Sequence, residues 1–152
     1  MDVYSLEAMM HTGPIPAIVT ADLTLTLVLG SDLDVPMPAS FNYSAHEPLA
    51  VTVDFVGTEA SVQWVFARDL LQGGMTRPVG EGDVTCWPGT NDQGHVVCIA
   101  LRSPTGEALL EAPADDVAAF LRRSYEVVPE GCEGDHLDID DLIAELLSEP
   151  GA

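Results

Sequence analysis

The chain has 152 residues, 47% of them hydrophobic, and carries 25 acidic residues against five arginines and no lysine, which gives a formal net charge of −20. This composition argues against a largely disordered chain, excludes lysine-based catalysis, and disfavours a surface that attracts the phosphates of nucleic acids or anionic membranes. The length fits a single domain, and no apolar run approaches the about 20 residues of a membrane-spanning helix.

Residues 1–18 are apolar and irregular, with a cluster of glycine and proline over 13–16. Such a cluster interrupts regular structure, so we expect a flexible N-terminal arm followed by one domain over 19–148. The first residues show neither the basic start nor the apolar core of a secretory signal, which favours a cytoplasmic protein.

Strict alternation of apolar and polar residues is typical of strands with one buried face. This pattern occurs over residues 21–29, 49–55 and 62–66. The last two segments are close in sequence and predict a hairpin. Pro36 and Pro38 predict a loop, followed by a short strand over 40–44.

The next segment predicts a short helix over 67–72, stopped by Gly73 and Gly74, which tolerate the left-handed backbone of a helix C-cap. A strand is expected over 82–87, ended by Pro88. Residues 95–102 are apolar on both faces and predict a central strand. A turn at 103–106 then leads into a return strand over 107–112.

Two helices are predicted near the C-terminus. Pro113 suits the first position of a helix, and one face of that helix is apolar as far as Val128. A second helix is expected over 138–148, with an apolar stripe on one side and carboxylates on the other. The order of these elements predicts an α+β fold with antiparallel sheets and packed helices.

The sequence contains none of the common catalytic or phosphate-binding motifs, so we expect neither an enzyme nor a cofactor site. Cys86, Cys98 and Cys132 are expected to be reduced, buried residues. His95 and Cys98 could form half a metal site, but residues three apart on a strand point to opposite faces.

Several side chains are candidates for binding a partner. Arg68 and Asp69, directly after the strand over 62–66, are candidate contacts; the alternative is that a nearby carboxylate holds Arg68. Leu142, Ile143 and Leu146 on the last helix form an apolar stripe that could dock on a partner or on another subunit, or fold onto the chain's own core.

Trp64 and Phe66 could in principle stack on nucleic-acid bases, but their period-2 position favours core packing. The acidic surface has two interpretations as well. It could complement a basic partner, or reflect codon or environment bias.

Three strings of the central region resemble a known family: WVFARDLL from Trp64, RPxGxGDVxxWP from Arg77 and VVCIALRSPTGEALLEAP from Val96. They are similar to the SsgA-like proteins, sporulation-specific cell-division regulators of filamentous bacteria, and most of all to the SsgB-type branch. The resemblance extends over about Val19 to Leu147. It implies a whirly-like fold with two antiparallel sheets and packed helices.

The resemblance also implies a function: a non-enzymatic adaptor without cofactors that helps position the tubulin-like division protein FtsZ at sporulation septa. FtsZ and other septal proteins would be its partners, and a homo-oligomer, with a trimer favoured, would be recruited from the cytoplasm to the septum without inserting into the membrane. One alternative is a single-stranded nucleic-acid-binding protein of whirly-like fold, which the scarcity of cations opposes. Another is a small-ligand or metal enzyme.

Overall fold

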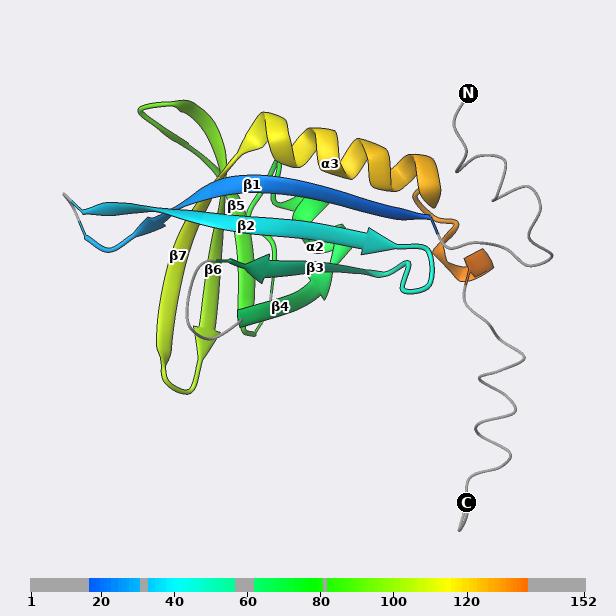
Figure 1. Ribbon diagram of the computed structural model, residues 1–152, viewed down its shortest axis with the longest axis horizontal. Coiled ribbons are helices and arrows are strands. Elements are labelled where there is room, and N and C mark those ends of the chain that lie inside the picture. Colours follow the sequence, from blue (N-terminus) through cyan, green and yellow to red (C-terminus); the bar gives the residue numbers. More distant parts are fainter. Residues whose placement is uncertain (1–16, 31–32, 57–61, 81, 137–152) are drawn as a thin grey trace, which may run out of the picture.

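The computed structural model describes residues 17–30, 33–56, 62–80 and 82–136. Within these ranges, the strands form one antiparallel sheet in the order β4-β3-β2-β1-β7-β6-β5 (Figure 1). The strands are β1 (Ile18–Val28), β2 (Asp34–Ser44), β3 (Ala50–Phe55), β4 (Val62–Ala67), β5 (Val84–Asn91), β6 (Gly94–Ser103) and β7 (Gly106–Pro113). The helices are α2 (Arg68–Gly73), α3 (Ala114–Val127) and a 3-10 helix, η1 (Glu133–His136).

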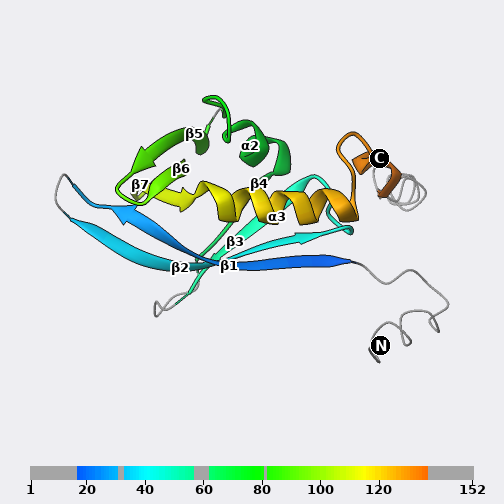
Figure 2. The same ribbon diagram turned by 90° about the horizontal axis from the view of Figure 1, so that it is seen from above.

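The sheet consists of two halves that meet at β1. This strand pairs with β2 from Ile18 to Val28, but it pairs with β7 only over Thr26 to Val28. α3 lies between the two halves and contacts strands of both (Figure 2). The predicted α+β fold with antiparallel pairing is confirmed. The expectation of two sheets is corrected, because β1 hydrogen-bonds to a strand of each half and joins them into one sheet.

The core fills the space between α3 and the sheet. Val117, Phe120 and Leu121 of α3 are buried, as the apolar periodicity of the helix requires. Phe120 meets Phe41 of β2 edge to face, with ring centroids 5.7 Å apart and an interplanar angle of 75°. Such a pair contributes roughly 0.5–1.5 kcal/mol beyond the area that it buries.

Two prolines that predict a loop lie inside β2 instead. The carbonyl oxygen of Pro38 accepts a hydrogen bond from the amide of Val56, so the backbone polar atoms of Pro38 face away from β1. Pro36 lies two positions before Pro38, so its backbone polar atoms face the same side of the strand, away from β1. Regular pairing between β2 and β3 begins only at Ala39. Neither proline therefore removes a hydrogen bond to β1, and the strand continues through both.

β5 likewise runs through Pro88, where the sequence predicts its end. The N–H and C=O of Cys86 pair with Val79 on the outer side of this edge strand. Pro88 lies two positions after Cys86, so its nitrogen also faces the outer side and its lack of an N–H removes no hydrogen bond to the neighbouring β6. Gly74 follows α2 as predicted, but with right-handed backbone angles (φ −66°, ψ −11°) rather than left-handed ones.

The remaining predicted elements of the described residues are close to those observed. β3 and β4 form the predicted hairpin, β6 is a central strand, and α3 starts directly after Pro113. The leucine face of β1 is buried at Leu23 and Leu25, whereas Leu29 lies beyond the strand end and is exposed. The predicted arm and last helix lie outside the described residues, apart from 17–18, and β1 already starts at Ile18.

Candidate functional site

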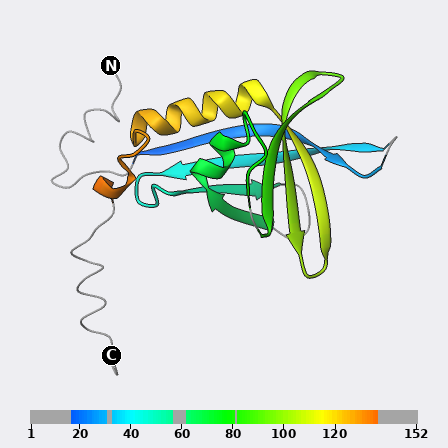
Figure 3. The same cartoon turned by 180° about the vertical axis from the view of Figure 1, so that it is seen from behind.

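Arg68, one of the predicted partner contacts, is inside the molecule. It is the first residue of α2 and follows β4 directly, and its side chain is 1% exposed. The alternation of β4 buries Phe66, exposes Ala67 and so turns Arg68 inward. The amide of Arg68 donates to the carbonyl oxygen of Leu49 at 2.8 Å, which fixes the backbone at this point. α2 packs beside β5, as the view from behind in Figure 3 shows.

The guanidinium of Arg68 caps the C-terminal end of α3. Its Nη1 donates to the carbonyl oxygens of Ser124 at 3.1 Å and of Val128 at 2.8 Å. The last carbonyls of a helix have no partner within the helix and carry the negative end of its dipole. α3 has no basic residue in its last turn, so a cation from a distant part of the chain stabilises these carbonyls.

Two tyrosine rings flank the same guanidinium. The Cζ atom of Arg68 lies 4.6 Å from the ring centroid of Tyr43 and 4.2 Å from that of Tyr125, within the range of cation–π attraction. Burial raises the pKa of Tyr125 to about 12, although the charge of Arg68 opposes this rise. Burial also raises the pKa of Tyr43, whose hydroxyl donates to the carbonyl oxygen of Pro48 at 2.8 Å. Both rings are therefore neutral at physiological pH.

Glu133 completes the arginine cluster, which we define as Arg68, Tyr43, Ser124, Tyr125 and Glu133. Its Oε2 accepts from Arg68 Nη2 at 2.8 Å, and this hydrogen bond holds the pKa of the carboxyl below its ordinary value of 4.5. The structure thus confirms that a carboxylate holds Arg68. Because the guanidinium is buried and engaged, any role in partner binding would be to position the surface around it.

The other predicted contacts stay a prediction. Asp69 is exposed next to Arg68, in the first turn of α2. Leu142, Ile143 and Leu146 lie outside the described residues. Of the five predicted residues, the structure describes only Arg68 and Asp69, which are adjacent in α2.

The sequence did not identify the other members of the arginine cluster. Glu133 and Ser124 lie 65 and 56 residues after Arg68 along the chain, so no local pattern joins them. One signal is present in the sequence: Arg68 continues the inward alternation of Trp64 and Phe66. A charged residue at a buried position of a strand pattern requires a partner, because burial of an unpaired charge costs much free energy.

The remaining candidates are the aromatic, cysteine and metal-ligating side chains of the described residues. Trp64 and Phe66 pack against the core, as predicted, rather than forming an exposed platform. Cys86 and Cys98 are buried, and burial raises the pKa of the Cys86 thiol to about 12, which keeps it protonated. Residues 17–30, 33–56, 62–80 and 82–136 contain no group of three metal-ligating side chains. In the same part of the chain, no helix has the length and apolar character needed to cross a bilayer.

The comparisons with known proteins decide the family. The family described as "Streptomyces sporulation and cell division protein, SsgA" matches residues 37–133, which include the whole arginine cluster. The chain belongs to this family. The match confirms the resemblance carried by the three central strings.

Relatives and solved structures agree with this assignment. The chain is 48% identical to the sporulation-specific cell division protein SsgB of Streptomyces coelicolor, over 86% of this chain and 96% of that protein. It is 44% identical to SsgB of Frankia casuarinae, over 85% and 91% of the two chains.

Two solved structures have the same fold. A structure of SsgB from Streptomyces coelicolor matches with a TM-score of 0.79 and 47% identity, over 82% of this chain and 99% of that one. An SsgA-like sporulation-specific cell division protein from Thermobifida fusca matches with a TM-score of 0.78 and 40% identity, over 89% and 99%.

Proposed function

We propose that this protein is a non-enzymatic adaptor that helps to position FtsZ-type division protein at sporulation septa. The observation that carries the proposal is the 48% identity to a sporulation-specific cell division protein over 86% of this chain and 96% of that protein. A role in cell division follows from the family. Contact with FtsZ, and with other septal proteins, is our proposal.

The arginine cluster supports an adaptor that works through a fixed shape. Arg68 ties the start of α2 to the end of α3 and, through Glu133, to the chain that follows α3. Charge-assisted hydrogen bonds of this kind are strong and directional, so they fix these elements relative to one another, although the Nε of Arg68 and the hydroxyl of Tyr125 are buried without a hydrogen-bond partner among the described residues. A rigid block is suited to presenting a docking surface, and we propose that it is recruited from the cytoplasm to the septum.

Assembly forms part of the same proposal. We infer a homo-oligomer, with a trimer favoured, and a whirly-like arrangement of the sheet, both on the basis of the resemblance. Exposed apolar residues support shared surface between subunits: Val62 and Val65 on the edge strand β4 are 43% and 54% exposed. Light scattering of the purified protein tests this part, and a strict monomer would contradict it.

Co-sedimentation with polymerised FtsZ tests the adaptor itself. The protein is mixed with FtsZ and GTP and centrifuged, and we expect it in the pellet with the polymers. FtsZ with GDP, which leaves few polymers, and an unrelated acidic protein of similar size serve as controls. Recovery of the protein in the supernatant at every FtsZ concentration would contradict the proposal.

A further inference from the structure

The face of the sheet opposite α3 has a continuous row of side chains across five strands. Register places Thr85 of β5 beside Ala100 of β6, Ala100 beside Leu109 of β7, and Leu109 beside Val28 of β1, which pairs with Asp34 of β2. In β5, β6 and β7 the neighbouring positions, such as Cys86, Ile99 and Leu110, point the other way and belong to the core. The row is thus the outer face of the sheet.

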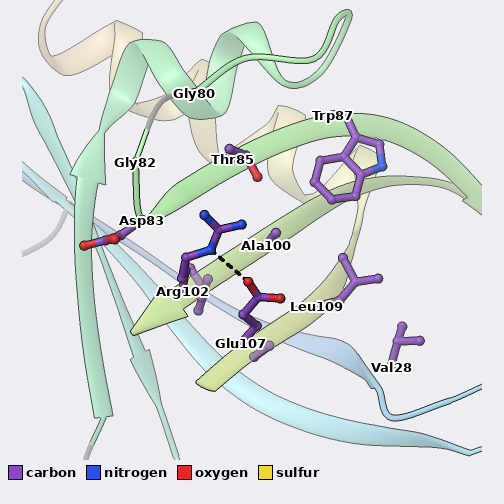
Figure 4. Close-up of a pocket in the computed structure, with 12 residues that line it drawn as sticks. Val28, Gly80, Gly82, Asp83, Thr85, Trp87, Ala100, Arg102, Glu107 and Leu109 are labelled. Carbon is purple, nitrogen blue, oxygen red and sulfur yellow. Dashed lines mark hydrogen bonds and ion pairs between the residues drawn. The ribbon is translucent and has the colours of Figure 1, made fainter. Parts of the chain in front are cut away.

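A hollow of about 520 Å³ lies over this row. Figure 4 shows Trp87, Leu109 and Val28 on one side of it, and the ion pair between Arg102 Nε and Glu107 Oε1, 2.8 Å apart, at its centre. Tryptophan and arginine are the residue types that most often dominate binding energy at protein interfaces. This hollow therefore combines an apolar wall with a central ion pair.

A second hollow, of about 450 Å³, adjoins the first, since Val28 lines both. Three of the described residues that line it are carboxylates, Asp34, Asp92 and Glu111, and none is an arginine. The side-chain amide of Asn91 donates to Glu111 at 3.1 Å, whereas Asp34 and Asp92 form no side-chain hydrogen bond or ion pair with the described residues. We call the two hollows together the trough.

We propose that the trough docks an extended segment of a partner protein that carries arginine or lysine and, a few positions away, large aliphatic residues. The carboxylates of the second hollow complement the basic residues, and the wall formed by Trp87 and Leu109 takes the aliphatic ones. Arg102, the cation of the trough, is already engaged by Glu107. This inference deepens the proposed adaptor function and rests on it, because an adaptor needs a site for a protein.

The geometry of the strands sets the spacing of the segment. From the apolar wall, formed by Leu109 on β7 and Trp87 on β5, to Asp34 on β2 the trough crosses two to four strand intervals, which is about 10–19 Å. An extended chain covers this distance with about three to six residues. We therefore expect basic and aliphatic residues about three to six positions apart.

A labelled peptide tests the trough without any division protein. The probe is a fluorescein-labelled peptide with the sequence Ser-Arg-Arg-Gly-Ser-Leu-Leu-Ser, and fluorescence anisotropy measures its binding. We expect saturable binding that weakens with added salt. Peptides with glutamate in place of arginine, or serine in place of leucine, should bind at least about tenfold more weakly.

Matched variants locate the site. The double variant Asp34→Lys/Asp92→Lys should weaken binding about tenfold, and Leu109→Ser should also weaken it. The control Asp115→Lys/Asp116→Lys makes the same change of net charge on α3, on the far side of the sheet, and should bind as the wild type does. Circular dichroism and thermal unfolding of each variant confirm that it is folded.

The outcomes separate the trough from the adaptor function. Absence of saturable peptide binding, or equal weakening by the control on α3, overturns the trough. If the peptide fails to bind while the protein still co-sediments with FtsZ, the trough is wrong and the adaptor function stands. If the peptide binds as expected but FtsZ does not retain the protein, the trough stands and the proposed partner is wrong.

Discussion

The guanidinium of Arg68 donates to the carbonyl oxygen of Val128 at 2.8 Å, across 60 residues of sequence. The start of one helix thereby stabilises the end of another. Arg68, which lies between two tyrosine rings and a carboxylate, therefore connects two helices inside the molecule and is not an exposed contact.

Replacing Arg68 with methionine, which has a similar apolar stem, should destabilise the fold. Arg68→Met removes the guanidinium donor from the carbonyl of Val128 and from the carboxylate of Glu133, and it leaves the carbonyl of Ser124 with only the amide of Val128. We expect the free energy of unfolding in urea to fall by roughly 3 kcal/mol. Arg102→Met is the matched control, since Arg102 forms an ion pair of the same 2.8 Å length with 67% of its side chain exposed.

The control should change the free energy of unfolding by less than about 0.5 kcal/mol. Equal losses in the two variants would show that burial of Arg68 contributes nothing.

The ion pair also makes stability depend on pH. The pKa of Glu133 is lowered in the folded state, mainly by the hydrogen bond from Arg68. Its contribution is therefore fully present above the ordinary value of 4.5 and is lost as the pH falls through the lowered value. Glu133→Gln should unfold at a lower urea concentration than the wild type near pH 7, and the difference should shrink below about pH 4. A difference that stays constant down to pH 3 would contradict this assignment.

Gly74 is required for close packing between α2 and β5. A Cβ atom at this position would lie 2.4 Å from the Cβ atom of Cys86, which is far inside van der Waals contact. Gly74→Ala should therefore lower the free energy of unfolding by roughly 1–3 kcal/mol. Gly30→Ala, where nothing lies within 4 Å, should have little effect. Similar thermal unfolding of the two variants would be inconsistent with the observed approach.

The aromatic pair should couple α3 to β2. In a double-mutant cycle of Phe41→Leu and Phe120→Leu, we expect a coupling free energy of roughly 0.5–1.5 kcal/mol from the edge-to-face contact at 5.7 Å. Urea unfolding of the wild type, both single variants and the double variant gives this value. Purely additive losses would mean that the two rings contribute only through the area that they bury.

Local patterns in the sequence predict much of this fold. Alternation identifies β1, β3 and β4, and the apolar face of α3 identifies the residues that meet the sheet. The loop predicted at Pro36 and Pro38 and the strand end predicted at Pro88 are wrong, because a proline interrupts a strand only if its nitrogen faces a paired neighbour. That orientation depends on the order of strands, which the sequence does not state.

The site is less predictable than the fold, for the same reason. The sequence identifies Arg68 as a candidate residue. Its partners, however, lie at the end of α3 and in η1 and reach it only in the folded chain. The trough depends on strand register in the same way, since it joins residues of β1, β2, β5, β6 and β7. The family resemblance, by contrast, needs only the three central strings and is confirmed.

Time-lapse microscopy of sporulating filaments tests whether this protein positions the division machinery, as we propose. Fluorescent fusions of the protein and of FtsZ are followed in the same cell. We expect the protein to mark future septa before FtsZ rings form there, and we expect the rings to lose their regular spacing in its absence. Regularly spaced FtsZ rings at septa that the protein reaches later, or never reaches, would contradict this proposal.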